Sequence, residues 1–490
     1  MDYETIIGLE VHSQLNTKSK MFCSCLATYQ DMGPNTVICP VCVGMPGTLP
    51  IPNVSAVKHV IRTGLALHCE IARESKFDRK NYPYPDLMKG YQISQFDKPI
   101  ASNGILLLEG ETAVKKIRIN RVHLEEDVAK LMHRSDNNEA YSLLDINRSG
   151  VPLMEIVSEP DLRSADQARE YLVNLRSILR YLKVSTANME EGSFRCDANI
   201  SIRPLGAKEL GPKVEVKNMN SFRAVHRALT FEEDRQIKAV NNGERIVQET
   251  RGWSDQDGET FSQRSKEQAH DYRFFPEPDI PPFEIDEAEV SALKNSLPEL
   301  PYARRARFEV SYGLSKNDAI QLTLSREMAD YFEAVVAVKS VHDETLNIHA
   351  KNVSNWLLGE MTRLLNERGQ DISEVKISPT NLIQLQGLVN AKTLSSTMAK
   401  EVFEQMFNTG MSPSQIVKKS GMQQISDEGE LQGIVKEAIK ANTKAVDDFL
   451  GGKETAVRFL VGQTMKLARG KANPKIAEQL VITELKKIKS

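Results

Sequence analysis

The stretch from Asn188 to Arg203 carries the side chains that first suggest chemistry. From Arg195 onward, apolar and polar residues alternate as they do along a half-buried strand, where successive side chains point to opposite faces. The polar face consists of Arg195, Asp197, Asn199, Ser201 and Arg203. Such a face is typical of the solvated side of an antiparallel sheet. It would also suit a site for an anionic, metal-bound substrate, and both interpretations stay open at this point.

Acids and a histidine recur at strand spacing elsewhere. Glu10 and His12 share one face of an alternating run from residue 6 to 15, a spacing that suits a metal ion or a phosphate-bearing ligand. A partly exposed strand edge would show the same pattern. Glu155 stands inside an apolar run, where an isolated carboxylate is costly unless it is paired or binds a metal.

A third alternating run ends in three consecutive acids. Its pattern places His123, Glu125 and Asp127 on one face and Glu126 on the other. Clustered like charges repel one another, so the run indicates that a divalent cation offsets them.

Four of the six cysteines lie close together, as Cys23-x-Cys25 and Cys39-x-x-Cys42. Two close pairs separated by a loop can arrange four thiolates tetrahedrally around zinc, and a site filled by four sulfurs would be structural. Reduced, packed thiols are the alternative, because the first pair is Cys-x-Cys rather than the commoner Cys-x-x-Cys.

The segment from Lys76 to Gln95 is predicted to be a loop, because it contains two prolines and a glycine. Basic residues, among them Lys80, interleave there with tyrosines. This mixture suits phosphates together with stacked bases, although a solvated loop with aromatic anchors would have the same composition.

Length and composition predict an ordinary globular protein. A chain of 490 residues with 40% hydrophobic and 26% charged residues should form two to four domains. The first residues lack the pattern of a signal peptide, and no apolar stretch is long enough to span a membrane. We therefore expect a cytoplasmic protein without structural disulfides. No phosphate-loop motif and no Gly-x-Ser-x-Gly motif occurs.

Proline-rich and glycine-containing segments divide the chain. Five prolines between residues 278 and 301 indicate one domain boundary, after which helical periodicities dominate, and a second boundary is predicted near residues 408–413. Residues 454–490 contain eight lysines or arginines against three glutamates. This basic helical tail suggests an RNA contact, with a merely solvated face as the alternative.

Several motifs together resemble the B subunit of the tRNA-dependent amidotransferases, which convert misacylated Glu-tRNA(Gln) or Asp-tRNA(Asn) to the amide. The resemblance extends over nearly the whole chain. The motifs that carry it are Ile7–His12, Lys76–Tyr82, His123–Asp127, Asp145–Pro160, Met189–Ser193, Arg195–Asn199, Val461–Gln463 and Gly470–Pro474.

The resemblance implies an α+β fold. An N-terminal antiparallel-sheet cradle domain, similar to the catalytic domain of glutamine synthetase, would cover residues 1–294 and include the cysteine loop 23–42. An all-α helical domain over 295–408 and an all-α, tRNA-binding tail domain over 409–490 would follow.

The resemblance also implies the reaction. The cradle domain would use ATP and Mg²⁺ to phosphorylate the side-chain carboxylate of the tRNA-linked amino acid, and ammonia would displace the phosphate. A glutaminase (amidase) partner, the A subunit, would supply the ammonia, and a small C subunit would complete a heterotrimer. A non-catalytic tRNA-binding scaffold in the same complex is the second interpretation. The clustered acidic residues described above favour the catalytic interpretation over the scaffold.

Site residues follow from the same resemblance. The implied Mg²⁺ ligands are Glu10, His12, Glu125, Glu155 and Asp197, with Glu190 and Glu191 as weaker candidates. The implied catalytic residues are Glu125, Glu155 and Arg195, and the implied ATP- or phosphate-binding residues are Lys80, Arg195 and Arg203. The implied tRNA-binding residues are Lys466, Arg469, Lys471 and Lys475.

Overall fold

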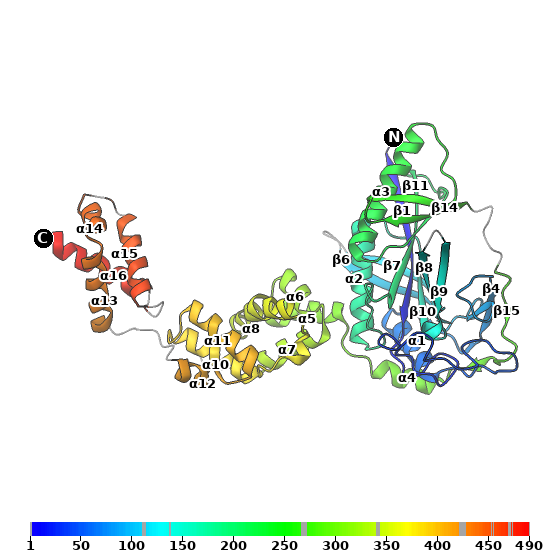
Figure 1. Cartoon of the computed structure of the whole chain (residues 1–490), viewed down its shortest axis with the longest axis horizontal. Helices are drawn as coiled ribbons and strands as arrows, with labels where there is room; N and C mark the ends of the chain where they lie inside the picture. The colour runs from blue at the N-terminus through cyan, green and yellow to red at the C-terminus, as the bar shows by residue number, and fades with distance from the viewer. Residues whose placement is uncertain are drawn as a thin grey trace. The chain divides into compact units, whose positions relative to one another are not determined.

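The chain folds into two compact units, residues 1–303 and 304–490, as seen in a computed structural model (Figure 1). The structure describes residues 2–489 except 110–113, 137–138, 266–271, 340–343, 421–427, 452, 454, 469–471 and 473. The first unit is built on a large sheet, and the second is helical. The predicted α+β class is therefore confirmed.

Among the described residues, nine strands form one sheet in the order β14-β13-β12-β11-β1-β10-β7-β6-β2. All neighbours are antiparallel except β12 and β13, which run parallel. The strands are β1 (Tyr3–Gln14), β2 (Glu70–Ile71), β6 (Ala101–Glu109), β7 (Val114–Glu126), β10 (Pro152–Ser158), β11 (Phe194–Pro204), β12 (Val214–Lys217), β13 (Glu249–Ser254) and β14 (Glu259–Ser265).

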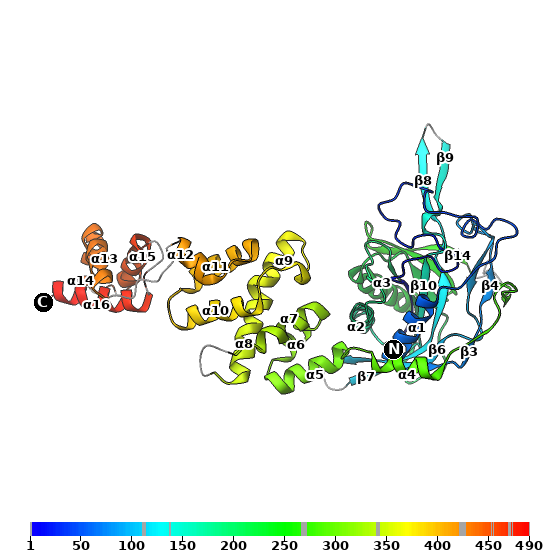
Figure 2. The ribbon, with the colours of Figure 1, turned by 90° about the horizontal axis from the view of Figure 1, so that it is seen from below.

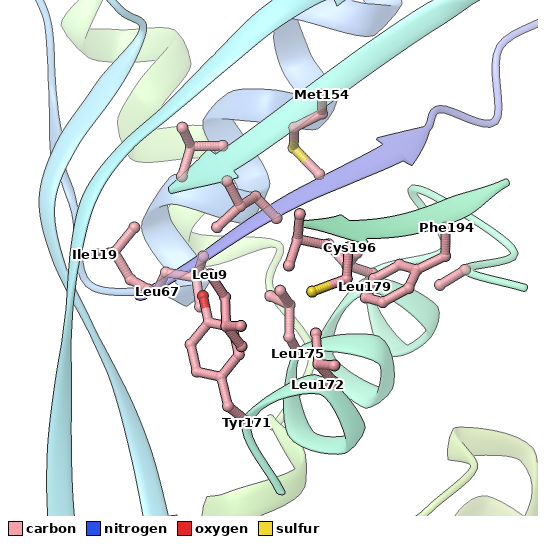
Figure 3. Close-up of a cluster of buried hydrophobic side chains, with 14 of the residues drawn as sticks. Leu9, Leu67, Ile119, Met154, Tyr171, Leu172, Leu175, Leu179, Phe194 and Cys196 are labelled. Atoms are coloured by element: carbon pink, nitrogen blue, oxygen red, sulfur yellow. The ribbon is translucent and has the colours of Figure 1, made fainter. Parts of the chain in front are cut away.

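One face of this sheet packs against helices. Figure 3 shows Leu172, Leu175 and Leu179 of α2 (Ala165–Tyr181) against Leu9 of β1 and Cys196 of β11. Ser164 caps the start of α2, because its side chain accepts a hydrogen bond from the Gln167 amide. Helices α1 (Val54–Ala66) and α3 (Phe222–Asn241) also contribute buried residues to this core. Each buried leucine contributes about 1.5–3 kcal/mol of hydrophobic stabilisation. The opposite face of the sheet is left for polar side chains.

The prediction of a loop between Lys76 and Gln95 is wrong at both ends. Strands β4 (Asp78–Asn81) and β5 (Tyr91–Ser94) pair antiparallel, and β15 (Phe275–Pro276) extends them to a three-stranded sheet. The helix-breaking prolines and Gly90 all lie in the connection between β4 and β5. The partner strand β15 lies almost 200 residues further along the chain, so local sequence could not reveal this pairing.

Several smaller elements belong to the first unit. Strands β3 (Glu74–Ser75) and β16 (Phe283–Glu284) pair with each other, and α4 (Glu287–Asn295) follows. Strands β8 (Lys130–Asp136) and β9 (Glu139–Asp145) form a hairpin that extends away from the rest of the unit in Figure 2. A 3-10 turn, Ile146–Arg148, joins this hairpin to β10.

The helices of the second unit surround separate hydrophobic clusters. The larger cluster is formed by α5 (Pro301–Tyr312), α6 (Lys316–Leu322), α7 (Arg326–Val336), α8 (Leu346–Trp356), α9 (Thr362–Arg368), α10 (Pro379–Asn390), α11 (Ser396–Thr409) and α12 (Pro413–Ser420). Two smaller clusters are formed by α13 (Glu428–Ala441), α14 (Thr443–Leu450), α15 (Thr455–Leu467) and α16 (Pro474–Lys489).

The larger cluster includes Ile416 and Val417 of α12, beyond the boundary predicted near residue 409. The three-domain division itself stays a prediction. No helix in the described part of the chain combines the length and the apolar character needed to cross a membrane.

Candidate functional site

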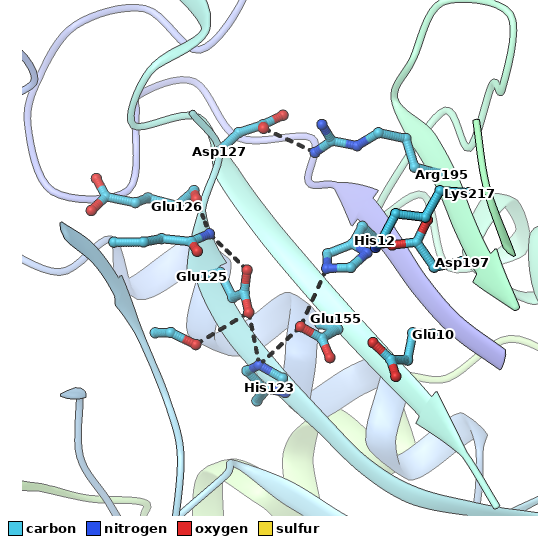
Figure 4. Close-up of polar contacts among 12 residues, drawn as sticks. Glu10, His12, His123, Glu125, Glu126, Asp127, Glu155, Arg195, Asp197 and Lys217 are labelled. Atoms are coloured by element: carbon cyan, nitrogen blue, oxygen red, sulfur yellow. Dashed lines mark hydrogen bonds and ion pairs between the residues drawn. The ribbon is translucent and has the colours of Figure 1, made fainter. Parts of the chain in front are cut away.

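Four strands place one row of polar side chains across the open face of the sheet. Glu155 of β10 lies opposite His123 of β7 on one side and opposite His12 of β1 on the other. His12 in turn lies opposite Arg195 of β11. The residues just before and after each of these four are buried, so the alternation of each strand fixes the row (Figure 4).

The row brings carboxylates and imidazoles into contact. The Nε2 atom of His12 is 3.2 Å from Oε2 of Glu155, and Nε2 of His123 is 3.5 Å from the same oxygen. His123 Nε2 is also 3.1 Å from Oε1 of Glu125. Glu125 and Glu155 are only 2% and 6% exposed. One ligand atom from each of His12, Glu125 and Glu155 lies within 4.8 Å of the others, close enough for a shared metal ion.

The electrostatics of the row keep Glu155 ionised. Burial alone would raise the pKa of its carboxyl group, but His123 and His12 hold that pKa well below its usual range. Burial lowers the pKa of His12, but the charge and hydrogen bond of Glu155, together with the charges of Glu125 and Asp197, raise that pKa by more. The pKa of Glu10 is raised by burial and by the nearby Glu155 carboxylate. The carboxylates therefore crowd one another, as they would around a bound cation.

The row lines a cavity of about 510 Å³. Glu10 and Asp197 also line it, so all five predicted Mg²⁺ ligands share one cavity. Glu10 accepts a hydrogen bond from Asn199 at 3.0 Å, and Asp197 pairs with Lys217. The donor set fits a hard cation such as Mg²⁺, because most of its ligand atoms are carboxylate oxygens.

Two of the predicted phosphate-binding cations lie at this cavity. Arg195 lines it and binds Asp127 through its guanidinium group at 2.9 Å. Lys80 lines it from β4, with its ammonium 4.9 Å from the ring centre of Tyr272. Burial lowers the pKa of Lys80, but the carboxylates of Glu125 and Glu155 raise it by more, so Lys80 carries a full positive charge.

The other predicted residues lie elsewhere. Arg203 is outside the cavity lining and binds Glu4, with Nε 2.8 Å from Oε2. Glu190 and Glu191 are exposed in the turn before β11. Lys466 lies in the last turn of α15 and Lys475 in the first turn of α16, both exposed in the second unit. The predictions for Arg469 and Lys471 fall outside the described residues.

The four cysteines at residues 23–42 form a second cluster. Their sulfur atoms all lie within 4.8 Å of one another, and none is in a disulfide. The Cys39 amide donates a hydrogen bond to Cys42 Sγ at 3.1 Å. A hydrogen bond from Cys23 lowers the pKa of the Cys42 thiol to about 5. Four converging sulfurs fit the predicted zinc site.

Sequence reasoning missed several residues of the acid cavity. Lys217 and Glu215 line it from β12, and their ion pair is 3.0 Å long. The alternation of Val214-Glu215-Val216-Lys217 could have placed both on the polar face. Gln92, which donates a hydrogen bond to Glu125 at 2.7 Å, belongs to the segment predicted as a loop and gave no signal.

Comparison with known families shows the class of protein. Residues 5–291 match the GatB/GatE catalytic domain, and residues 330–485 match the GatB domain. The first unit is thus a catalytic domain of the GatB/GatE class. The chain as a whole belongs to the family formed by the B subunits of aspartyl/glutamyl-tRNA(Asn/Gln) amidotransferases, as its relatives show.

Three relatives carry that subunit name. The protein of Dehalococcoides mccartyi is 56% identical over 482 residues, which cover 98% of each chain. The protein of Thermomicrobium roseum is 52% identical over 483 residues, again 98% of each chain. The protein of Caldanaerobacter subterraneus is 51% identical over 488 residues, which cover 99% of this chain and all of the relative.

Proposed function

We propose that this chain is the kinase and amide-forming subunit of a tRNA-dependent amidotransferase. It would act on Glu-tRNA(Gln), Asp-tRNA(Asn) or both, with ATP as phosphoryl donor. The observation that carries the proposal is the convergence of half-buried His12 with buried Glu125 and Glu155 in a cavity that Lys80 and Arg195 also line. A carboxylate-rich centre flanked by cations suits the transfer of a phosphoryl group between two anions.

The reaction runs in two displacements. An oxygen of the substrate carboxylate attacks the γ-phosphorus of ATP, ADP leaves, and an acyl phosphate forms. Ammonia then attacks the acyl carbon, inorganic phosphate leaves, and the nitrogen loses a proton to give the amide. Bound Mg²⁺ would offset the negative charge that gathers during the first displacement.

The residues of this chain have distinct roles in that scheme. Glu125 and Glu155, with His12, would hold Mg²⁺, and Glu10 and Asp197 would complete its surroundings. Lys80 and Arg195 would bind phosphate oxygens through charge-assisted hydrogen bonds. Glu125 accepts from Gln92 at 2.7 Å and from Ser94 at 3.2 Å, which fixes its orientation.

Partners complete the proposal. The relatives are named as one subunit of an amidotransferase, and this chain has no Gly-x-Ser-x-Gly motif, which fits a complex in which another chain makes ammonia. We assign that role to a glutaminase partner, the A subunit, with a small C subunit as third member and the cytoplasm as location. The basic residues of the tail, including Lys466 and Lys475, would contact tRNA phosphates.

The cysteine cluster would bind structural Zn²⁺. Four sulfurs fill a tetrahedral site and leave no open position for a substrate. The cluster would stabilise the loop between β1 and α1.

The test compares Glu125→Gln with wild type in the reconstituted complex, with Glu-tRNA(Gln), Mg²⁺, ATP and glutamine. We expect the variant to bind tRNA normally but to lose ATP hydrolysis and Gln-tRNA formation together. Glu259→Gln, an exposed glutamate on β14, is the control and should remain active. A Glu125→Gln complex that still makes Gln-tRNA would favour the scaffold interpretation.

A further inference from the structure

Lys20 is a completely buried lysine in the segment between β1 and α1. Its exposed fraction is 0%, and it is among the largest fully buried side chains of the chain. Lysine is almost never buried in this way unless its charge is compensated, because removing an ammonium group from water is costly.

The contacts of Lys20 join both halves of the cysteine cluster. Its backbone N–H donates a hydrogen bond to the Cys25 carbonyl at 2.8 Å. Its Nζ donates to the Val37 carbonyl at 2.8 Å and lies 3.6 Å from Cys42 Sγ. The ammonium group is therefore held against the sulfur cluster by the fold.

Within the described part of the chain, no carboxylate forms an ion pair with Lys20. Other lysines of this unit with little exposure do have such partners, for example Lys76, which pairs with Asp78 and Asp97, and Lys89, which pairs with Glu126. The neighbour of Lys20 that can carry negative charge is the sulfur of Cys42.

Four neutral thiols would leave the Lys20 ammonium uncompensated. Four thiolates around one Zn²⁺ carry a net charge of about −2, which an adjacent ammonium reduces to about −1. Donors to coordinating groups orient them and tune metal affinity, and their removal typically weakens binding by about 10- to 100-fold.

We propose that Lys20 is the charge-neutralising residue of the cysteine metal site. Its ammonium offsets part of the negative charge of the zinc–tetrathiolate group and so slows the loss of the metal. The inference rests on the proposed zinc site and extends it to a residue that is not itself a ligand.

The test measures zinc retention rather than amidation. The complex is purified with wild-type chain, Lys20→Gln or Lys20→Arg, and zinc per chain is determined by mass spectrometry. The rate of zinc transfer to a colorimetric chelator is then followed. Glutamine keeps a donor for the Val37 carbonyl but removes the charge, whereas arginine keeps the charge. Lys76→Gln, which removes a lysine paired with carboxylates in the same unit, is the matched control.

We expect Lys20→Gln to release zinc about 10-fold faster or more, and Lys76→Gln to release it at the wild-type rate. Substitution by Co²⁺ should still give the charge-transfer absorption of a four-sulfur site in Lys20→Gln, since no ligand is removed. Equal release rates for wild type and Lys20→Gln would overturn the proposal.

The arginine variant decides the matter if the glutamine variant does not fold. Lys20→Arg keeps the positive charge and should therefore retain its zinc. A folded Lys20→Arg chain that loses its zinc overturns the proposal. A wild-type chain that binds no zinc after reconstitution would instead refute the zinc site itself. The two failures are thus distinguishable.

Discussion

His12 and Glu155 lie directly opposite each other on the paired strands β1 and β10, and their side chains meet at 3.2 Å. On its other side Glu155 faces His123, at 3.5 Å. A carboxylate between two imidazoles remains ionised even when buried, because both rings favour its charged form. The sheet thus holds an anionic oxygen in place, on elements more rigid than loops.

Glu155→Gln keeps the size of this side chain but removes its charge. We expect the Mg²⁺ concentration for half-maximal ATP turnover to rise about 10-fold or more, because an anionic ligand is lost from the site. A Mg²⁺ titration of ATP hydrolysis in the complex measures the shift. Glu159→Gln, just beyond the end of β10, is the control. An unchanged Mg²⁺ dependence would show that Glu155 is only structural.

Cys42→Ser should empty the cysteine cluster, since a hydroxyl group binds zinc far more weakly than a thiolate does. The loop is tied to the segment before β10: the Val37 amide donates to Asn147 at 2.8 Å, and Ser149 donates to the Cys42 carbonyl at 3.2 Å. Losing the metal should therefore destabilise the whole first unit.

For Cys42→Ser we expect a zinc content well below one per chain and a fall in Tm of about 3 °C, which corresponds to about 2 kcal/mol in a unit of 303 residues. Elemental analysis and calorimetry measure both. Cys69→Ala, a buried cysteine outside the cluster, should keep its zinc. Full zinc occupancy in Cys42→Ser would contradict a four-sulfur site.

Strand alternation made part of the acid cavity predictable. A period of two residues fixes the face of each side chain, so Glu10, His12, Glu125 and Asp197 could be placed on polar faces from sequence. Alternation does not fix position along a strand. Arg203 shares a face with Arg195 but lies eight residues further along β11, roughly 27 Å away at about 3.4 Å per residue. It binds Glu4 instead of lining the cavity.

The register between neighbouring strands could not be predicted from the sequence. The pairing of His12 with Glu155 joins residues more than 140 positions apart, and their alignment depends on the whole sheet. The same limit hid β4 and β5, whose pairing is extended by Phe275 and Pro276. Lys217 is a different case, because β12 alternates as clearly as the longer strands do. Its alternation was therefore a usable signal, although four residues are short for a strand.

The ion pairs of Glu333 make the stability of the second unit depend on pH. Burial would raise the pKa of Glu333, but hydrogen bonds from Arg307, at 2.6 Å, and from Arg304 lower it. A lowered pKa means that the folded state favours the ionised form, so this stabilisation is present above the unfolded-state pKa of about 4.3 and is lost as the pH falls below it.

We expect Glu333→Gln to lower the free energy of unfolding at pH 7 by about 1–2 kcal/mol, a value kept small because the side chain is partly exposed. The difference from wild type should shrink as the pH falls below about 4. Calorimetry at several pH values measures it, with Glu401→Gln, exposed on α11, as control. A difference that stayed constant with pH would show that charge is not the cause.

Lys466 tests the proposed role of the tail in holding tRNA. Replacing a lysine that contacts a phosphate weakens binding for any RNA sequence and reduces the slope of log K against log salt by about one unit. We expect Lys466→Gln to behave in this way in filter-binding assays, while the turnover rate at saturating tRNA stays unchanged, because a phosphate contact contributes to binding and not to the chemical step. Lys392→Gln, an exposed lysine outside the tail, is the control. If affinity and slope matched wild type, this lysine would be part of a solvated face; a loss of turnover at saturating tRNA would instead mean that the tail positions the substrate for chemistry.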